Sequence, residues 1–308
     1  MSMSNWVHYK NGNYNVHLCL TDGSKIRYNN LDFFDASRPE NLDIKITNRC
    51  NMGCSFCHEN STCTGKHSDA LHDKFIETLP EWTECAFGGG NVLEYPDLIP
   101  FLQKCKALHL ISNITVHQKH FMENLSLLRQ LRDDKLIYGM GISLVDASMP
   151  GFIDAVKEFP NAVIHVINGI VTYNDLKALS QHGLKILILG YKTVRRGEAY
   201  YKKESESIKL NQGDLYFALE YIAENGWFDT ISFDNLALKQ LDPKRFLEEK
   251  FYDIAYMGDD GIDGKQTSAS YYVDLVEGVF GRNSCDTEHR YPIKGKTAIG
   301  CYQFLKNL

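Results

Sequence analysis

Short apolar runs and helical patterns alternate along the chain between residues 42 and 233. Runs such as Ile186, Leu187, Ile188 and Leu189 are typical of strands that are covered on both faces of a parallel sheet. We expect strands at 42–47, 83–87, 112–116, 139–145, 161–168, 184–190 and 228–233. Apolar residues at helical spacing predict helices at 71–79, 98–105, 118–133, 150–158, 173–182 and 212–225. The alternation predicts an α/β protein with right-handed crossovers between parallel strands.

The two ends of the chain show other patterns. Alternating apolar residues in 14–28, with Asp22 and Gly23 between them, predict a β-hairpin with a two-residue turn. The segments 253–257 and 270–276 predict a pair of strands. The glycine- and aspartate-rich loop between them lacks the closing glutamate of a calcium loop, which favours a plain solvated turn. We therefore expect an N-terminal hairpin at 1–40, a core at 41–235 and a C-terminal extension at 236–308.

Cys50, Cys54 and Cys57 form a CxxxCxxC pattern directly after the first strand of the core. Three thiolates this close can hold three irons of a [4Fe-4S] cluster and leave the fourth iron without a protein ligand. The C-terminal end of a strand is also where barrel enzymes keep their catalytic groups. A structural zinc site with His58 as fourth ligand is the alternative. It is disfavoured because zinc sites usually place a second ligand pair farther along the chain.

This cysteine motif resembles that of the radical S-adenosylmethionine (radical SAM) family. The run Phe87, Gly88, Gly89, Gly90 and Asn91 resembles the family's Gly-Gly-Glu motif, which holds the methionine end of the cofactor. Asn91 stands where the acid often sits, so other groups would have to carry more of the contact with the methionine ammonium. The resemblance covers about residues 40 to 235. It implies a partial (βα)6 TIM-like barrel, with the C-terminal extension and its glycine-rich loop closing the mouth.

The same resemblance implies the chemistry. A reduced [4Fe-4S] cluster cleaves S-adenosylmethionine to methionine and a 5′-deoxyadenosyl radical, which abstracts hydrogen from a substrate C–H bond. Such an enzyme is oxygen-sensitive and takes its electron from a one-electron reductant such as flavodoxin or ferredoxin. The cofactor supplies the reactivity, while the protein supplies position and exclusion of water.

Further residues are assigned from their place in these motifs. For cofactor binding we expect the glycines, whose lack of a Cβ allows close approach, together with Phe56, Asn91, Ser143 and Asn168. Ser143 could equally be an ordinary sheet serine. For substrate binding the candidates are His58, His117, Lys192 and Arg195. A helix-start role for His117 and a solvated basic loop around Lys192 and Arg195 fit equally well. Cys285 and Cys301 are interpreted as plain thiols, because two cysteines do not supply an auxiliary cluster.

Composition narrows the partners and the compartment. The chain has 308 residues, 44% hydrophobic and 23% charged, which is ordinary for a globular protein. A net charge of −6 argues against a nucleic-acid partner, which normally binds a basic face. No leader-like segment and no run of membrane-spanning length is present, and nine cysteines with three clustered indicate a reducing cytoplasm.

Four interpretations of function follow from these observations. Modification of a peptide or protein side chain is favoured. The others are the same chemistry on a small metabolite or nucleotide, activation of a glycyl-radical enzyme, and a non-catalytic Fe–S or zinc protein.

Overall fold

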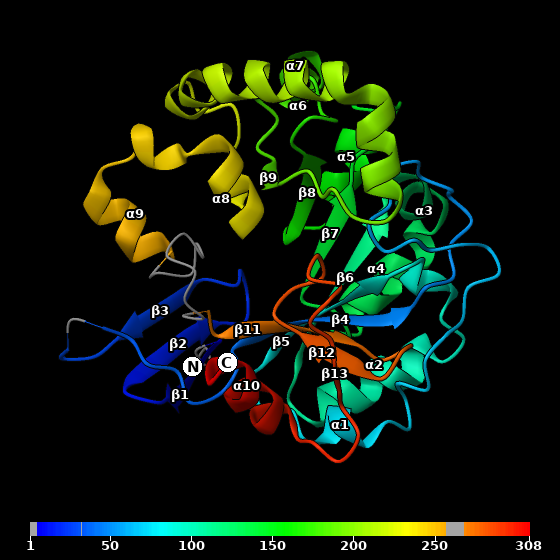
Figure 1. The fold of residues 1–308 in the computed structure, drawn as a ribbon, viewed down its shortest axis with the longest axis vertical. Coiled ribbons are helices and arrows are strands. Elements are labelled where there is room, and N and C mark those ends of the chain that lie inside the picture. The colour runs from blue at the N-terminus through cyan, green and yellow to red at the C-terminus, as the bar shows by residue number, and fades with distance from the viewer. Residues whose placement is uncertain (1–4, 32, 257–267) are drawn as a thin grey trace.

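The fold is described from a computed structural model, which describes residues 5–31, 33–256 and 268–308. In these segments the strands form two sheets, one of three strands and one of ten (Figure 1). The larger sheet has the order β10-β9-β8-β7-β6-β5-β4-β11-β12-β13. Its end strands are β10 and β13, so the sheet is open.

Seven parallel strands in chain order make up most of the larger sheet. They are β4 (Asn41–Thr47), β5 (Glu84–Gly89), β6 (Ile111–His117), β7 (Gly139–Ser143), β8 (Ala162–Ile167), β9 (Lys185–Leu189) and β10 (Thr230–Phe233). All seven predicted strands are therefore confirmed, as is the α/β fold. The partial (βα)6 barrel is not confirmed, since the sheet does not close.

Helices connect the strands and cover the outer face of the sheet (Figure 1). They are α1 (Lys74–Glu77), α2 (Leu98–Ala107), α3 (Gln118–Glu123), α4 (Leu125–Asp133), α5 (Phe152–Lys157), α6 (Tyr173–Leu179), α7 (Arg196–Glu224), α8 (Asn235–Leu241), α9 (Glu249–Tyr256) and α10 (Ala298–Lys306), with the short 3-10 turns η1 (Val92–Glu94) and η2 (Pro243–Arg245). The side of β4 that faces them is apolar, because Leu42, Ile44 and Ile46 are at most 1% exposed.

Several helix bounds differ from the prediction. The first helix is only α1, which begins after the N-cap Asp73 and ends at Thr78. Helix α2 begins at Leu98 as predicted and extends two residues further, to Ala107. The predicted helix at 118–133 is interrupted at Asn124. The last predicted helix, at 212–225, extends back to residue 196 as α7. Its first half was missed because it is polar and carries no apolar period; it is supported by pairs such as Glu198–Lys202.

The smaller sheet consists of β1 (Trp6–Asn11), β2 (Tyr14–Cys19) and β3 (Lys25–Tyr28). The predicted hairpin strands are confirmed, but the two-residue turn is wrong. Cys19 N donates to Ser24 O at 2.8 Å, so the loop spans 20–23. Strand β1 escaped prediction because half of its six residues are polar and no regular apolar alternation runs through WVHYKN.

A buried ion network joins the smaller sheet to the larger one. Glu40, fully buried, accepts hydrogen bonds from Arg27 and Lys25 of β3, and Lys25 also pairs with Glu84 of β5. Burial opposes ionisation of Glu40, but the hydrogen bonds and charges of Arg27 and Lys25 outweigh it and lower its pKa to about 2. The network therefore ties β3 to the larger sheet beside the start of β4 and β5.

The C-terminal segment extends the larger sheet beyond β4. Strand β11 (Ser270–Asp274) runs parallel to β4, and β12 (Val279–Gly281) and β13 (Tyr291–Pro292) follow antiparallel. The predicted pairing of 253–257 with 270–276 is wrong, because residues up to Tyr256 belong to α9 and β11 pairs with β4. The loop at 258–267, expected to be a solvated turn that helps to close the mouth, lies outside the described residues. None of the described helices has the length and apolarity that crossing a membrane requires.

Candidate functional site

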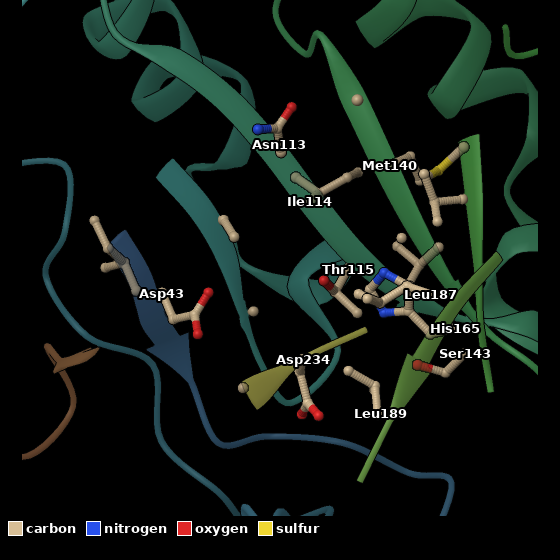
Figure 2. A pocket seen from close by; sticks show the side chains of 18 of the residues that line it. Asp43, Asn113, Ile114, Thr115, Met140, Ser143, His165, Leu187, Leu189 and Asp234 are labelled. Carbon is tan, nitrogen blue, oxygen red and sulfur yellow. The ribbon is translucent and has the colours of Figure 1, made fainter. Parts of the chain in front are cut away.

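A cavity of about 1030 Å³ lies against the inner face of the larger sheet. In a packed barrel the inward positions are filled by bulky branched side chains. Here β5 and β7 present small residues instead, namely Ala86, Gly88, Gly139 and Gly141, and all of them line the cavity. The small residues of β5 and β7 thus leave the cavity open. Polar side chains such as Asp43, Asn113 and His165 point into it (Figure 2).

The three cysteines of the CxxxCxxC motif lie together on the loop that follows β4, and all three line this cavity. Each is a free thiol of intermediate exposure. The loop is tied down on both sides: Cys50 N donates to Thr62 O at 2.8 Å, and Asn91 N donates to Arg49 O at 2.7 Å. His120 of α3, nearly fully buried, forms a 2.8 Å hydrogen bond with Asn51 Oδ1. The thiols are thus held in place by the backbone around them.

The surroundings of these thiols suit a cationic metal group. Burial raises the pKa of Cys50 and of Cys54, and the neighbouring Cys57 raises both further, while Arg196 lowers them. Three thiolates at one place therefore need a cationic partner. Arg196 lines the same cavity, and its Nε is buried without a hydrogen-bond partner. In the described ranges no three His, Cys, Asp or Glu side chains converge as ligands of one metal ion. A cubane differs from such a site, since each thiolate binds a separate iron.

The glycine turn lies against the cysteine loop. Gly88, Gly89 and Gly90 all line the cavity, and Gly90 N donates to Thr47 O at 2.7 Å. A Cβ on Gly90 would stand 2.2 Å from Arg49 O, one residue before Cys50. The backbone of the turn thus packs directly on the backbone that carries the first cysteine, which only glycine permits.

Asn91 does not line the cavity. Its side chain caps η1 by accepting from Leu93 N, and its Nδ2 donates to Glu94 Oε1 at 2.9 Å. The amide is therefore engaged inside the turn. A role toward the methionine end of a cofactor stays a prediction for this residue.

The other predicted cofactor residues fall in different places. Ser143 lines the cavity. Phe56 instead packs edge-on against Tyr200 of α7, with ring centroids 5.9 Å apart. Asn168 is fully buried behind β8, where its Nδ2 donates to Gln240 Oε1 at 3.0 Å and its Oδ1 has no partner. The structure thus brings Ser143 to the cavity and leaves Phe56 and Asn168 outside its lining.

His117 meets both descriptions given to it from the sequence. It lines the cavity at the end of β6, and its Nδ1 accepts from Lys119 N at 3.2 Å as the N-cap of α3. Burial, with His120 and Lys119, lowers its pKa to about 4, so the ring is neutral at pH 7.

Charged residues surround the mouth of the cavity beside the cysteine loop. Lys192 lines it and contacts Ser284 Oγ at 3.2 Å and His58 Nε2 at 3.4 Å. Arg195 stays outside the lining and donates to His58 O at 3.0 Å. Glu59 lines the cavity, pairs with Lys45 at 3.2 Å and accepts a hydrogen bond from Tyr272 of β11. The C-terminal segment thus supplies two lining residues, Tyr272 and Ser284; that it closes the mouth stays a prediction.

Asp43, His165 and Asp234 line the middle of the cavity and were also missed (Figure 2). The first two carried a signal. Asp43 interrupts the apolar run of β4, and His165 interrupts that of β8, at positions that alternate with buried residues. A polar residue at such a position in a covered strand points to an inner cavity.

Comparison with known proteins identifies the fold. No protein-family model matches the chain, and no curated protein matches it in sequence. Among solved structures, SuiB of Streptococcus suis bound to S-adenosylmethionine superposes with a TM-score of 0.61 at 12% identity, over 99% of this chain and 89% of SuiB. SuiB bound to its precursor peptide SuiA gives 0.57 at 12% identity, over 96% and 87%. The enzyme anSMEcpe with bound AdoMet gives 0.48 at 14% identity, over 86% and 83%.

The chain thus shares the fold of SuiB across nearly its whole length. At 12% identity this likeness shows the fold alone, so the resemblance to the radical SAM family stays a prediction.

Proposed function

We propose that this chain is a radical SAM enzyme that modifies a peptide or protein substrate. One observation carries the proposal: the cysteine triad and the glycine turn, far apart in sequence, line one end of a single cavity. They do so in a fold shared with a protein that binds S-adenosylmethionine. The family's two motifs therefore meet at one place.

In this proposal Cys50, Cys54 and Cys57 hold three irons of a [4Fe-4S] cluster. When bound and reduced, the cluster would supply the electron that cleaves S-adenosylmethionine to methionine and a 5′-deoxyadenosyl radical, which abstracts hydrogen from a substrate C–H bond. Gly88 to Gly90 offer open backbone to the methionine end of the cofactor, and Ser143 offers a hydroxyl to its ribose. Arg196 Nε, buried and unpartnered, offers a hydrogen bond to an anionic group beside the thiols.

The chain order of the parallel strands supports a sheet related to the family's partial barrel, although here the sheet is open. In the proposal, the C-terminal segment with Tyr272 and Ser284 covers the mouth and keeps water from the reacting groups. We place the enzyme in the cytoplasm, where a one-electron reductant such as flavodoxin or ferredoxin would serve it.

A peptide substrate is favoured because SuiB was solved with its precursor peptide SuiA. The cavity is also large and is lined partly by polar side chains. A small metabolite held through Lys192 is the second candidate. Deuterium transfer from labelled candidate substrates into 5′-deoxyadenosine distinguishes them, since it reports which molecule loses hydrogen.

The proposal is tested by anaerobic reconstitution of the purified chain. We expect about four irons per chain and formation of 5′-deoxyadenosine from S-adenosylmethionine with a strong reductant. A protein that instead takes up one zinc and never cleaves the cofactor would be the non-catalytic metal protein, and the proposal would be wrong.

A further inference from the structure

Three polar side chains in the middle of the cavity have no hydrogen bond or ion pair with any residue in the described ranges. They are Asp43 of β4, Thr115 of β6 and His165 of β8, and all three point into the hollow (Figure 2). We call the part of the wall formed by Asp43, Thr115, Gly141, His165 and Asp234 the inner chamber. Polar groups that converge on a cavity without internal partners are the usual mark of a ligand site.

The inner chamber is a built feature of the sheet. A Cβ on Gly141 of β7 would lie 2.2 Å from Cε1 and 2.4 Å from Nε2 of His165. The imidazole therefore occupies the space that any other residue at 141 would fill. Ala86 and Gly88 keep β5, two strands away, equally bare, so the chamber stays open beyond the cysteine end.

The charges around the inner chamber do not balance. Asp43 forms no direct ion pair in the described ranges, although Lys192 acts on it from the mouth, and Asp234 uses only Oδ1, which accepts from Gly190 N at 2.9 Å and from Ala237 N at 2.7 Å. The nearby ammonium, Lys192, is bonded to Ser284 and His58 at the mouth. Asp43 is exposed within the open cavity, so its carboxylate is accessible to a ligand. A cation from outside would complete the set.

The pKa of His165 agrees with this charge count. Desolvation by the surrounding wall raises the pKa of Asp43, as do Glu59 and Asp234, while Lys192 lowers it. Burial and Lys192 lower the pKa of His165 to about 4, so its ring is neutral at pH 7. His165 therefore cannot serve as the counter-cation, but it can accept or donate a hydrogen bond.

We propose that the inner chamber binds a primary alkylammonium group of the substrate, with Asp43 as its counter-charge and His165 and Thr115 as hydrogen-bond partners. This inference rests on the proposed function, to which it adds the substrate class. In a peptide the group would be a lysine side chain, and in a metabolite a free amine. A cavity of about 1030 Å³ has room for it beside a cofactor, since it slightly exceeds the largest usual single-ligand site, about 1,000 Å³.

Binding of small probes tests the inference without turnover. N-acetyl-lysine methylamide, N-acetyl-norleucine methylamide and n-pentylamine are titrated by calorimetry or ligand-observed NMR into as-isolated and reconstituted protein. The first and third carry the ammonium, and the second lacks it. We expect the lysine probe to bind at least about tenfold more tightly than the norleucine probe. The tighter of the two amines shows whether the ammonium arrives on a peptide or on a free amine.

Two isosteric variants assign the effect to one carboxylate. Asp43→Asn should remove the preference for the ammonium and leave norleucine binding unchanged. Asp214→Asn, which changes an exposed aspartate of α7, should behave as wild type. Equal binding of charged and neutral probes by the wild type, a measurement that needs no variant, would overturn the inference. So would a preference that survives in a folded Asp43→Asn protein.

The two proposals can fail separately. Cofactor cleavage without ammonium binding would remove the inner-chamber assignment alone. Ammonium binding at Asp43 in a protein that never cleaves S-adenosylmethionine would remove the radical SAM function alone.

Discussion

Alanine substitutions at Gly88 and Gly90 should act in opposite directions on stability. The two glycines are two residues apart in one turn, yet their surroundings differ. A Cβ on Gly90 would lie 2.2 Å from Arg49 O, 2.8 Å from Arg49 C and 2.9 Å from Arg49 N. A Cβ on Gly88 would find Thr115 Cβ at 3.9 Å, an ordinary contact. Neither has a left-handed backbone, so the difference is purely steric.

The magnitudes follow from these contacts. Relief of the Gly90 clash requires two backbones to separate by about 1 Å, and no side-chain rotation can provide it. We expect Gly90→Ala to lower the free energy of unfolding by about 1–3 kcal/mol, the usual cost of overpacking. Gly88→Ala should raise it by about 0.5 kcal/mol, because alanine loses less entropy than glycine in a strand. Its methyl group, however, projects into the cavity beside the expected cofactor.

Urea denaturation of both variants, iron content after reconstitution and titration with S-adenosylmethionine form the assay. Gly90→Ala should be destabilised and bind less iron, since the displaced backbone carries Cys50. Gly88→Ala should keep its stability and its iron but bind the cofactor about tenfold more weakly, or about 1.4 kcal/mol. The reasoning is refuted if Gly90→Ala is as stable as wild type, or if Gly88→Ala binds the cofactor normally.

Two further variants probe the cysteine loop and the buried ion network. Cys54→Ala should lose both iron and 5′-deoxyadenosine formation, whereas Cys63→Ala, an exposed thiol on the same loop, should keep both; retained turnover in Cys54→Ala would contradict the ligand assignment. Glu40 has its pKa lowered from 4.5 to about 2, so its stabilising effect is fully present above pH 4.5 and is lost as the pH falls toward 2. Wild type should lose about 3 kcal/mol of stability from this group across that window. Glu40→Gln should show a flatter pH profile and a lower stability at pH 7, because Arg27 and Lys25 lose their partner. Equal slopes of stability against pH in urea titrations of the two proteins would show that the network does not act this way.

The sequence predicted those features whose causes are local. The seven strands followed from apolar runs that need no knowledge of the neighbours, and the cysteine triad from its spacing. Strand β11 was found as a strand, but not its place. Parallel pairing with β4 depends on contacts between residues more than 200 positions apart, and no local pattern encodes it. The polar first half of α7 was missed for the related reason that its exposed face leaves no apolar period.

The site was predictable to the same extent. Cysteines and glycines carry their chemistry in short motifs, so their meeting in one cavity could be expected from strand order alone. Asn168 shows the limit: it follows a strand as expected, but its side chain turns to Gln240 and away from the cavity. The chamber formed by Asp43, His165 and the small residues of β5 and β7 depends on which side of each strand faces inward. That becomes visible only when the strands are assembled.

The central claim is that three thiolates leave one iron of the cluster free for S-adenosylmethionine. It is tested most directly by electron–nuclear double resonance on reduced, oxygen-free protein with a cofactor whose carboxylate bears a magnetic oxygen isotope. The account predicts a hyperfine coupling between that oxygen and the cluster. An intact four-iron cluster whose spectrum shows no such coupling, and does not change when the cofactor is added, would contradict it.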